Sequence, residues 1–451
     1  MKKLAIVLLC SVLASGISHA QVRVESSWFS NVAVGIVNPL PVSSQDRTAT
    51  PFGEALFTAT SAGCVTGLVV RDTATHWSYF GQAVILILIQ IGGLGVVTVA
   101  ASLSMIAGKK LSLKQQSTMQ ESISAPKIGG VAKFTGFVVK TTFIIETVGA
   151  ALLMPVMISR FGASGIWRSF FHSISAFCNA GFDLMGTPDG QYQSMTSFSS
   201  AAYVNAVIIL LIIIGGIGFI TWEDVAKHKL RIKRYRMQSK VVLVTSAILI
   251  ILPALFFFFT EYSALPVGER TASSLFQSVT TRTAGFNTKD LTTLSGAGRI
   301  IFIVLMLVGG SPGSTAGGMK TTTLAVLTSN LVAVIRRRDD THFFGRRIDQ
   351  SVTKNAAAVF IMYLFLFLAG GTAISMIEGI PIGACLFETA SAVGTVGLTL
   401  GITTSLGNAS RIIIMVLMFL GRVGALTMIY AALTGRDRKA SRYPLENITV
   451  G

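Results

Sequence analysis

Six long apolar runs, separated by short polar segments, dominate the hydrophobic pattern of this chain. They cover residues 84–101, 207–221, 241–259, 300–310, 356–377 and 412–433. A bilayer-spanning helix needs about 20 predominantly apolar residues, and each run approaches or reaches that length. Of the 451 residues, 51% are hydrophobic and only 13% are charged, which is unusual for a soluble domain. The pattern predicts an all-α, polytopic membrane protein.

A second pattern recurs four times along the chain. A run led by phenylalanine passes into small and hydroxyl-bearing residues, then a glycine, then a bulky apolar residue. The glycines are Gly67, Gly181, Gly285 and Gly397, spaced 114, 104 and 112 residues apart. Such a long period marks a domain-sized unit rather than a solenoid repeat. We therefore expect four pseudo-repeats of helix, pore loop and helix around a central ion pathway.

The expected repeats cover residues 1–127, 128–237, 238–350 and 351–451. The second shows the pattern best, with an outer helix at 133–159, a half-helix at 167–177, an extended segment at 178–182 and an inner helix at 203–222. Two spans per repeat return the chain to the same side of the membrane. Four clusters of Lys and Arg, at 109–114, 227–236, 336–347 and 436–442, agree with this, because the positive-inside rule places them all in the cytosol.

The net charge of +17 comes largely from these four separated loops, so a nucleic-acid surface is not expected. Orientation signals and a docking face for an acidic cytosolic partner remain as readings of the basic loops. No metal-ligand spacing joins the five histidines or the cysteines Cys10, Cys64, Cys178 and Cys385.

The recurring glycines suit an ion filter. A dehydrated cation needs several oxygen ligands, and backbone carbonyls supply them without a charge that holds the ion too tightly. Glycine adopts the unusual backbone angles that turn carbonyls toward one axis, and the C-terminal ends of half-helices such as 52–62 carry partial negative charge. The candidate filter is each glycine with the two residues before it, namely Val65, Thr66, Gly67, Asn179, Ala180, Gly181, Thr283, Ala284, Gly285, Thr395, Val396 and Gly397. A single copy would more simply be a turn between two helices.

Each inner helix also carries a glycine motif, which begins at Gly92, Gly215, Gly309 and Gly421. Close helix packing explains the first two motifs. The third holds five glycines and a proline in ten residues, so no stable helix runs through it, and at membrane depth it must line a cavity or be buried in protein. Its residues are Gly309, Gly310, Ser311, Pro312, Gly313, Ser314, Thr315, Ala316, Gly317 and Gly318. A structural kink is the alternative. ATP binding is disfavoured, because Met319 breaks the phosphate-loop spacing and no strand precedes it.

In the fourth motif Arg422 replaces the second glycine. A charge at that depth is costly and indicates a function by default, whereas an arginine that reaches the interface is the structural alternative. Together with the glycine-rich segment, Arg422 predicts a gate below the filter.

These segments resemble the Trk/Ktr/HKT superfamily of potassium transporters, and most closely the membrane subunit of bacterial Ktr systems. The similarity is carried by residues 55–73, 177–182, 281–287, 309–321 and 395–399 and extends from about residue 39 to residue 451. It implies K⁺ uptake through the filter, gated by the loop and Arg422. Whether Na⁺ also acts as a coupling or activating ion stays open from the sequence. In that superfamily a serine at the first filter position accompanies sodium transport, so Gly67 implies a potassium preference.

The resemblance also implies a multi-pass protein of the bacterial inner membrane with a cytosolic C-terminus. It implies a homodimer, dimer contacts through the tail at 443–451, and a cytosolic nucleotide-binding regulatory ring, so that this chain itself binds no cofactor. A sodium-selective or sodium-coupled transporter is the nearest alternative. An enzyme is not expected, since the spans hold no paired carboxylates or His/Asp clusters.

The N-terminus departs from the family pattern. Lys2 and Lys3 followed by the apolar stretch 4–16 resemble a secretory signal peptide, whereas the family has a full outer helix ending near residue 41. A short first helix, a missing outer helix and an altered gene start all remain open.

Overall fold

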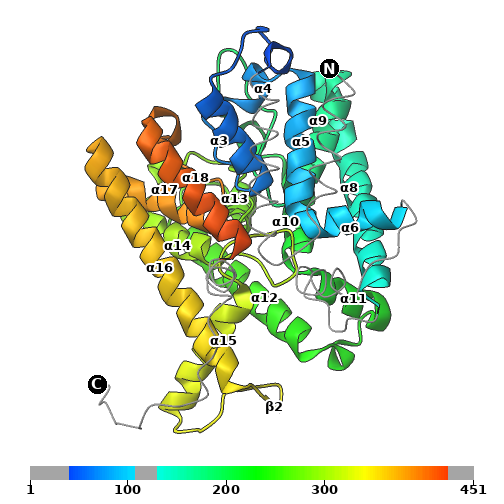
Figure 1. Cartoon of the computed structure of the whole chain (residues 1–451), viewed down its shortest axis with the longest axis vertical. Helices are drawn as coiled ribbons and strands as arrows, with labels where there is room; N and C mark the ends of the chain where they lie inside the picture. The colour runs from blue at the N-terminus through cyan, green and yellow to red at the C-terminus, as the bar shows by residue number, and fades with distance from the viewer. Residues whose placement is uncertain (1–39, 107–129, 425–451) are drawn as a thin grey trace.

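The computed structural model describes residues 40–106 and 130–424. The signal-like segment, the basic clusters at 109–114 and 436–442 and the tail at 443–451 lie outside these residues. Figure 1 shows an assembly of helices, and the described part contains a single two-stranded hairpin, β1 (His342–Phe343) with β2 (Arg346–Arg347).

The longer helices follow one another in a recurring order of long and short elements. They are α3 (Phe52–Gly63), α5 (Tyr79–Leu94), α6 (Val96–Ile106), α8 (Val131–Phe161), α9 (Ser164–Phe177), α10 (Ala202–Gly216), α11 (Phe219–His228), α12 (Met237–Phe259), α13 (Val267–Thr280), α14 (Gly296–Leu307), α15 (Thr321–Ile335), α16 (Gln350–Glu378), α17 (Ile382–Gly394) and α18 (Asn408–Val423). Among them lie α4 (Thr73–His76) and the single turns η1 (Pro41–Ser43), η2 (Thr196–Phe198), η3 (Ile232–Arg234), η4 (Leu291–Thr293) and η5 (Thr403–Ser405).

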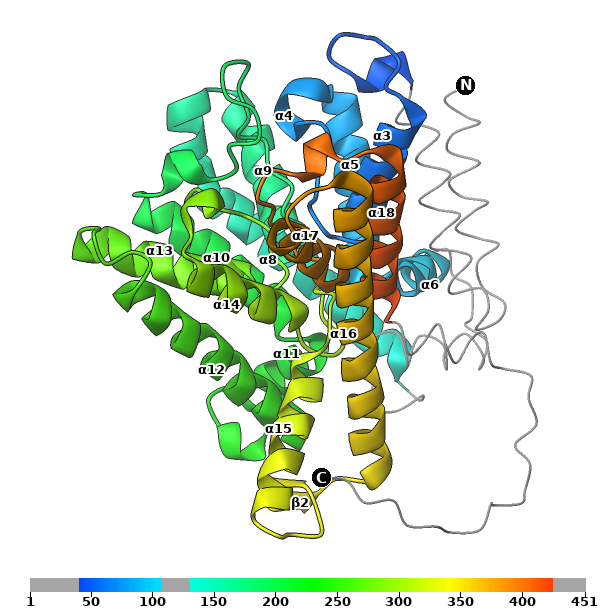
Figure 2. The same cartoon turned by 90° about the vertical axis from the view of Figure 1, so that its left-hand side faces the viewer.

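Three described helices, α8, α12 and α16, are long and apolar enough to cross a membrane. Large apolar side chains such as Phe143, Ile251 and Phe365 are more than half exposed on them, as expected for faces that meet lipid. Each of the three is followed by a short helix, α9, α13 or α17. α16 runs along the left-hand edge in Figure 1, and α12 runs along the lower left edge in Figure 2, where α17 lies among the other helices.

The inner helices differ from the prediction. The span expected at 203–222 is α10 and α11, which are bent by 100° at a short break. The apolar run 84–101 is broken in the same way between α5 and α6. The last glycine of each motif causes the break, because Gly95 and Gly218 have φ of 86° and 89°, a conformation that leaves the helix and that glycine adopts readily.

The third inner helix ends at Leu307, which agrees with the break expected from residue 309 onward. The run at 412–433 is not a single helix, because α18 ends at Val423 and Gly424 has a φ of 82°. The runs at 241–259 and 356–377 do lie within single helices. Hydrophobicity alone does not report backbone conformation, which explains why the breaks at Gly95, Gly218 and Gly424 were not predicted.

The short helices are anchored by the phenylalanines that begin each repeated phrase. Phe57, Phe171, Phe276 and Phe387 are all 0% exposed. The predicted half-helix at 52–62 is α3, and the one at 167–177 lies within α9. Their shortness leaves them unable to cross a bilayer, so each ends inside the protein.

Glycines let the inner helices touch the ends of these short helices. A methyl group on Gly92, Gly215 or Gly421 would lie 2.3, 2.0 or 2.1 Å from a backbone carbonyl oxygen at the end of α3, α9 or α17, respectively. Close packing is therefore confirmed for the first two motifs, and it extends to the fourth. In the third, Gly309 instead packs on Gly317 of the glycine-rich segment.

Candidate functional site

Four glycines from four separate segments surround one point of the molecule. A methyl group on any of them would lie within 3.0 Å of a backbone carbonyl oxygen of the next segment. The pairs are Gly67 with Ala180, Gly181 with Ala284, Gly285 with Val396 and Gly397 with Thr66, at 2.5, 2.9, 2.3 and 2.2 Å. The series returns to its start, so the four segments form a closed ring. The ring brings all twelve residues of the candidate filter together.

The backbone of these segments alternates in hand. The residue two positions before each glycine has a positive φ, and so has the glycine, whereas the residue between them does not. The non-glycine residues are Val65, Asn179, Thr283 and Thr395, with φ of 57°, 57°, 71° and 51°. Alternating left-handed and right-handed residues turn successive carbonyls to the same side of the chain. Such conformations are costly outside glycine and cluster at functional sites.

Buried hydroxyl groups hold this backbone in place, and the sequence prediction missed them. They are Ser61, Ser175, Thr280 and Ser391, all 0% exposed. Ser61 Oγ accepts from the Gly67 N–H at 3.1 Å, and Ser391 Oγ accepts from the Gly397 N–H at 3.0 Å. The other two donate to the carbonyl just after the glycine, that of Phe182 or Phe286. The available signal was a hydroxyl residue six positions before the glycine, or five in the third phrase, which is one residue shorter.

A cavity of about 150 Å³ opens on one side of the ring and is lined by all four glycines together with Asp72 and Asp183. Asp72 is 6% exposed and accepts from the N–H groups of Ala74, Thr75 and Tyr192, so it supports the loop. Asp183 accepts from the Met185 N–H at 2.9 Å. Burial raises the pKa of the Asp183 carboxyl to about 7, against the lowering effect of this hydrogen bond. Asp183 therefore places a titratable charge at the mouth of the ring.

On the other side of the ring lies the glycine-rich segment between α14 and α15. Its neck is closed by a parallel bridge of Val308 and Met319, in which the Gly309 N–H donates to the Met319 carbonyl at 2.8 Å. The segment is anchored to α9 and α10, because Thr315 donates from its N–H to the Gly215 carbonyl and from its hydroxyl to the Phe177 carbonyl at 2.9 Å. It therefore lies directly behind the Asn179 segment of the ring.

Arg422 ties this segment to two other parts of the chain. From α18, its guanidinium donates to the carbonyls of Thr315, Gly92 and Gly93. These carbonyls belong to the glycine-rich segment and to the end of α5. The glycine-rich segment also contacts the Thr395 segment of the ring, since a methyl group on Gly317 would lie 2.1 Å from Thr395 Oγ1. The glycine-rich segment and Arg422 thus connect α5, α9, α10 and α18 beneath the ring.

Lys320 is a second cation at this level that the sequence prediction did not include. Its ammonium donates to the Ala316 carbonyl at 2.9 Å and lies 3.5 Å from the Gly317 carbonyl. Carbonyl dipoles, rather than carboxylates, hold both Lys320 and Arg422 within the part of the chain that the structure describes. A lysine beside a glycine-rich break was the available signal.

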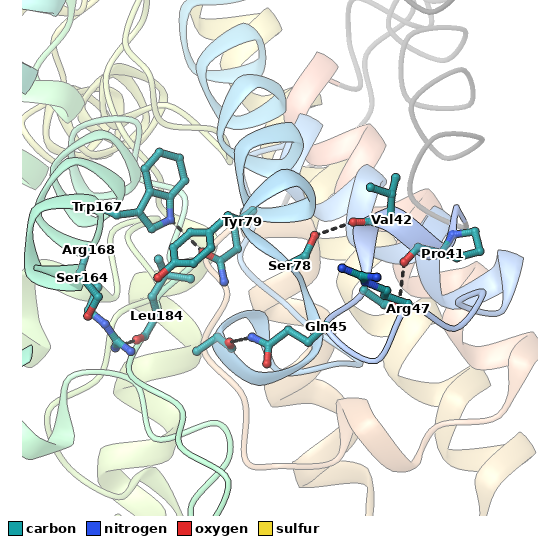
Figure 3. A pocket seen from close by; sticks show the side chains of 13 residues that line it. Pro41, Val42, Gln45, Arg47, Ser78, Tyr79, Ser164, Trp167, Arg168 and Leu184 are labelled. Atoms are coloured by element: carbon teal, nitrogen blue, oxygen red, sulfur yellow. Dashed lines mark hydrogen bonds between the residues drawn. The ribbon is translucent and has the colours of Figure 1, made fainter. Parts of the chain in front are cut away.

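A larger cavity, of about 760 Å³, lies elsewhere (Figure 3). It is bounded by η1 and by the N-terminal ends of α5 and α9, with Tyr79, Trp167 and Arg168 in its wall. Trp167 Nε1 donates to Gln82 Oε1 at 2.8 Å. Neither the ring nor the glycine-rich segment lines this cavity, so its size does not make it part of the candidate pathway. Among the described residues, no cluster of His, Cys, Asp and Glu suits a metal ion.

The apolar spanning helices, the short helices that end inside the protein and the closed ring of backbone define a polytopic α-helical membrane protein of the ion-transport class. A family model described as "Cation transport protein" (TrkH) matches residues 17–439. The chain belongs to the TrkH family of cation transport proteins, which confirms the fold class and the resemblance found from the sequence. This is a family of transporters and not of enzymes.

Similar proteins include the potassium/sodium uptake protein NtpJ of Enterococcus hirae, 39% identical over 92% of this chain and 94% of that protein. The Ktr system potassium uptake protein B of Bacillus subtilis is 38% identical over 94% of this chain and 95% of its own length. Among solved structures, the potassium transporter TrkH of Vibrio parahaemolyticus aligns with a TM-score of 0.70 at 18% identity, covering 92% of this chain and 84% of that one.

Proposed function

We propose that this chain takes up K⁺ across the bacterial cytoplasmic membrane through the closed ring of four glycine segments. The ring is the observation that carries the proposal, because four backbones with matching, strained geometry meet at one point. Similar proteins named for potassium uptake support K⁺ as the substrate. In this proposal the four segments belong to four pseudo-repeats around one pathway.

Selectivity would come from backbone carbonyls that replace the hydration shell of the ion. The helices α3, α9, α13 and α17 end directly before the ring, so the partial negative charge at their C-termini favours a cation there. The ring leaves no room for a side chain at its four glycine positions. The hydroxyl groups of Ser61 and Ser391 accept hydrogen bonds from the N–H groups of two of these glycines. The carbonyl oxygens that would coordinate the ion are thus preorganised.

The glycine-rich segment and Arg422 would form the gate. The segment lies behind the filter and is anchored by Thr315, while Arg422 joins it to the end of α5. A guanidinium beneath the ring also repels a passing cation. Opening then requires that the Arg422 bonds break and that the segment leaves the pathway. Its five glycines and one proline form no continuous helix that would resist this movement.

The assembly around the pore belongs to the same proposal. We place the basic segments 227–236 and 336–347 in the cytosol, together with the C-terminus, and expect a homodimer that binds a nucleotide-binding regulatory ring there. Figure 1 shows α11, the end of α15 and β2 toward one end of the molecule and α3 and α4 toward the other. The similarity to a protein named as part of a Ktr system supports a multi-component transporter.

Sodium is the second candidate ion, since NtpJ is named for potassium and sodium uptake. A potassium-uptake-deficient bacterium that expresses this chain, with and without a Ktr-type regulatory subunit, would separate the cases. We expect growth at low K⁺ and Rb⁺ uptake that K⁺ inhibits more strongly than Na⁺ does. Equal inhibition by both ions would favour a sodium transporter, and no uptake under either condition would contradict the proposal.

A further inference from the structure

The four filter segments differ in charge at the position three residues before the glycine. That position holds Cys64, Cys178, Arg282 and Gly394. All four are buried, with Arg282 only 8% exposed. One segment of the ring therefore carries a fixed positive charge where the other three carry small neutral residues.

Few groups compensate the Arg282 charge. Among the described residues its guanidinium makes a single hydrogen bond, from Nη2 to Ser246 Oγ on α12 at 3.2 Å, and Nε has no partner there. No carboxylate among the described residues forms an ion pair with Arg282. A void of about 10 Å³ beside it is lined mostly by apolar residues such as Ile212 and Ile250, with Asn179 as the other polar residue. Its field is thus not cancelled by a counter-charge at contact distance.

The backbone of Arg282 is joined to the neighbouring filter segment, because Asn179 Nδ2 donates to the Arg282 carbonyl at 3.4 Å and to Thr283 Oγ1 at 3.3 Å. Arg282 also follows the C-terminus of α13 by two residues. A cation is favoured at that end of a helix, which explains how the fold tolerates it. The same charge offsets the dipole that would otherwise attract an ion to the third segment.

We propose that Arg282 sets how tightly the ring holds its ion, by weakening cation binding enough for rapid release. Conduction requires sites that bind an ion well enough to admit it and weakly enough to let it leave. The C-terminal ends of α3, α9 and α17 attract the ion, whereas Arg282 offsets the attraction by the C-terminal end of α13. This inference rests on the proposed transport through the ring and adds a residue that tunes affinity and turnover.

The test is Rb⁺ uptake by proteoliposomes or cells that contain the full-length chain, with Arg282→Met to remove the charge and Arg282→Lys to keep it. We expect Arg282→Met to lower the KM for Rb⁺ about tenfold and to lower the maximal rate. Coulomb's law gives a factor of this order for any unit charge at roughly 10 Å and an effective dielectric constant near 20. Arg282→Lys should stay within about twofold of the wild type in KM.

Divalent block distinguishes charge from packing. Coulomb energy is proportional to the charge of the ion, so the factor for Ba²⁺ is the square of that for Rb⁺, about a hundredfold stronger inhibition in Arg282→Met. Ser246→Ala removes the hydrogen bond of Arg282 but not its charge, and should leave both values unchanged. The proposal would be overturned in favour of a positioning role by either of two results: the same fold-change for Rb⁺ and Ba²⁺ in Arg282→Met, or a change of KM in Ser246→Ala as large as that in Arg282→Met.

Protein yield and thermal stability in detergent show whether each variant folds. Equilibrium Rb⁺ binding to purified protein is also measured, including for variants that no longer transport. An unchanged binding constant in a folded Arg282→Met would also overturn the inference. If the wild-type chain itself transports and binds no Rb⁺, the proposed function fails instead, so the two failures are distinguishable.

Discussion

Replacing Arg422 with alanine is expected to increase cation flux if the proposed gate is correct, because this side chain joins α18 to the glycine-rich segment and to the end of α5. Its guanidinium donates to the carbonyls of Thr315, Gly92 and Gly93. A hydrogen bond to a charged group contributes about 1.5–3 kcal/mol when its partner has no replacement. When Arg422 is removed, water can bond to the three carbonyls and recover part of the lost energy. We therefore take the energy of one bond, about 2 kcal/mol, as the net contribution of Arg422 to the stability of the closed state.

A change of about 2 kcal/mol shifts the ratio of open to closed protein by roughly 30-fold. The assay is initial Rb⁺ uptake in a potassium-uptake-deficient bacterium that expresses the chain without a regulatory subunit, normalised to the amount of protein in the membrane. Arg422→Lys should give an intermediate increase, because an ammonium keeps the charge but lacks the planar fork that reaches several carbonyls. Deletion of residues 311–317 should raise the flux as well.

Arg411→Ala is the matched control, since this arginine lies on the same helix, 11 residues earlier. It bonds to the Thr404 carbonyl and pairs with Glu54, and neither residue belongs to the proposed gate. Its uptake should equal that of the wild type. If Arg422→Ala and the loop deletion both leave the flux unchanged while the proteins are present in the membrane, the assignment of the gate is wrong.

Three further outcomes are expected. Gly67→Ala should abolish Rb⁺ uptake without preventing membrane insertion, because Gly67 has a φ of 92° and a methyl group there would lie 2.5 Å from a carbonyl oxygen; uptake at the wild-type rate would contradict the ring. Ser391→Ala should reduce discrimination between K⁺ and Na⁺ several-fold, about 1 kcal/mol for the lost bond to the Gly397 N–H, whereas Ser405→Ala, an exposed control, should not. Asp183, whose pKa burial raises to about 7, is ionised above that pH and neutral below it, so the KM for Rb⁺ should rise as the external pH falls from 8 to 6, and Asp183→Asn should lose this dependence.

Much of the candidate site could be predicted because its signals are local. A filter segment needs glycine at one backbone position, and a break in a helix needs glycines and a proline, so both appear in the order of residues along the chain. Four copies in matching context identified Gly67, Gly181, Gly285 and Gly397, and the ten-residue break identified the segment 309–318. The prediction of an arginine at the gate required only its position in the fourth motif.

The helix breaks at Gly95 and Gly218 were missed for a different reason. The apolar runs continue through both glycines, and a glycine inside a helix looks the same in sequence as one that leaves it. Whether such a residue takes a positive φ depends on what packs on it. In the structure the segment after Gly218 is held by the glycine-rich loop, since the Phe219 N–H donates to the Gly313 carbonyl at 2.7 Å.

The sequence by itself determined the membrane class, the family, the four glycines and the interrupted third inner helix, because hydrophobicity and backbone freedom are properties of single residues and their neighbours in the chain. Only the tertiary structure decided that the glycines close into a ring, that Arg422 bonds to carbonyls of two other segments and that Arg282 has no carboxylate partner among the described residues. The contacts made by the ring, by Arg422 and by Arg282 join residues about 35 to 330 positions apart in the chain. Their energies depend on distance in space, which the order of residues does not contain.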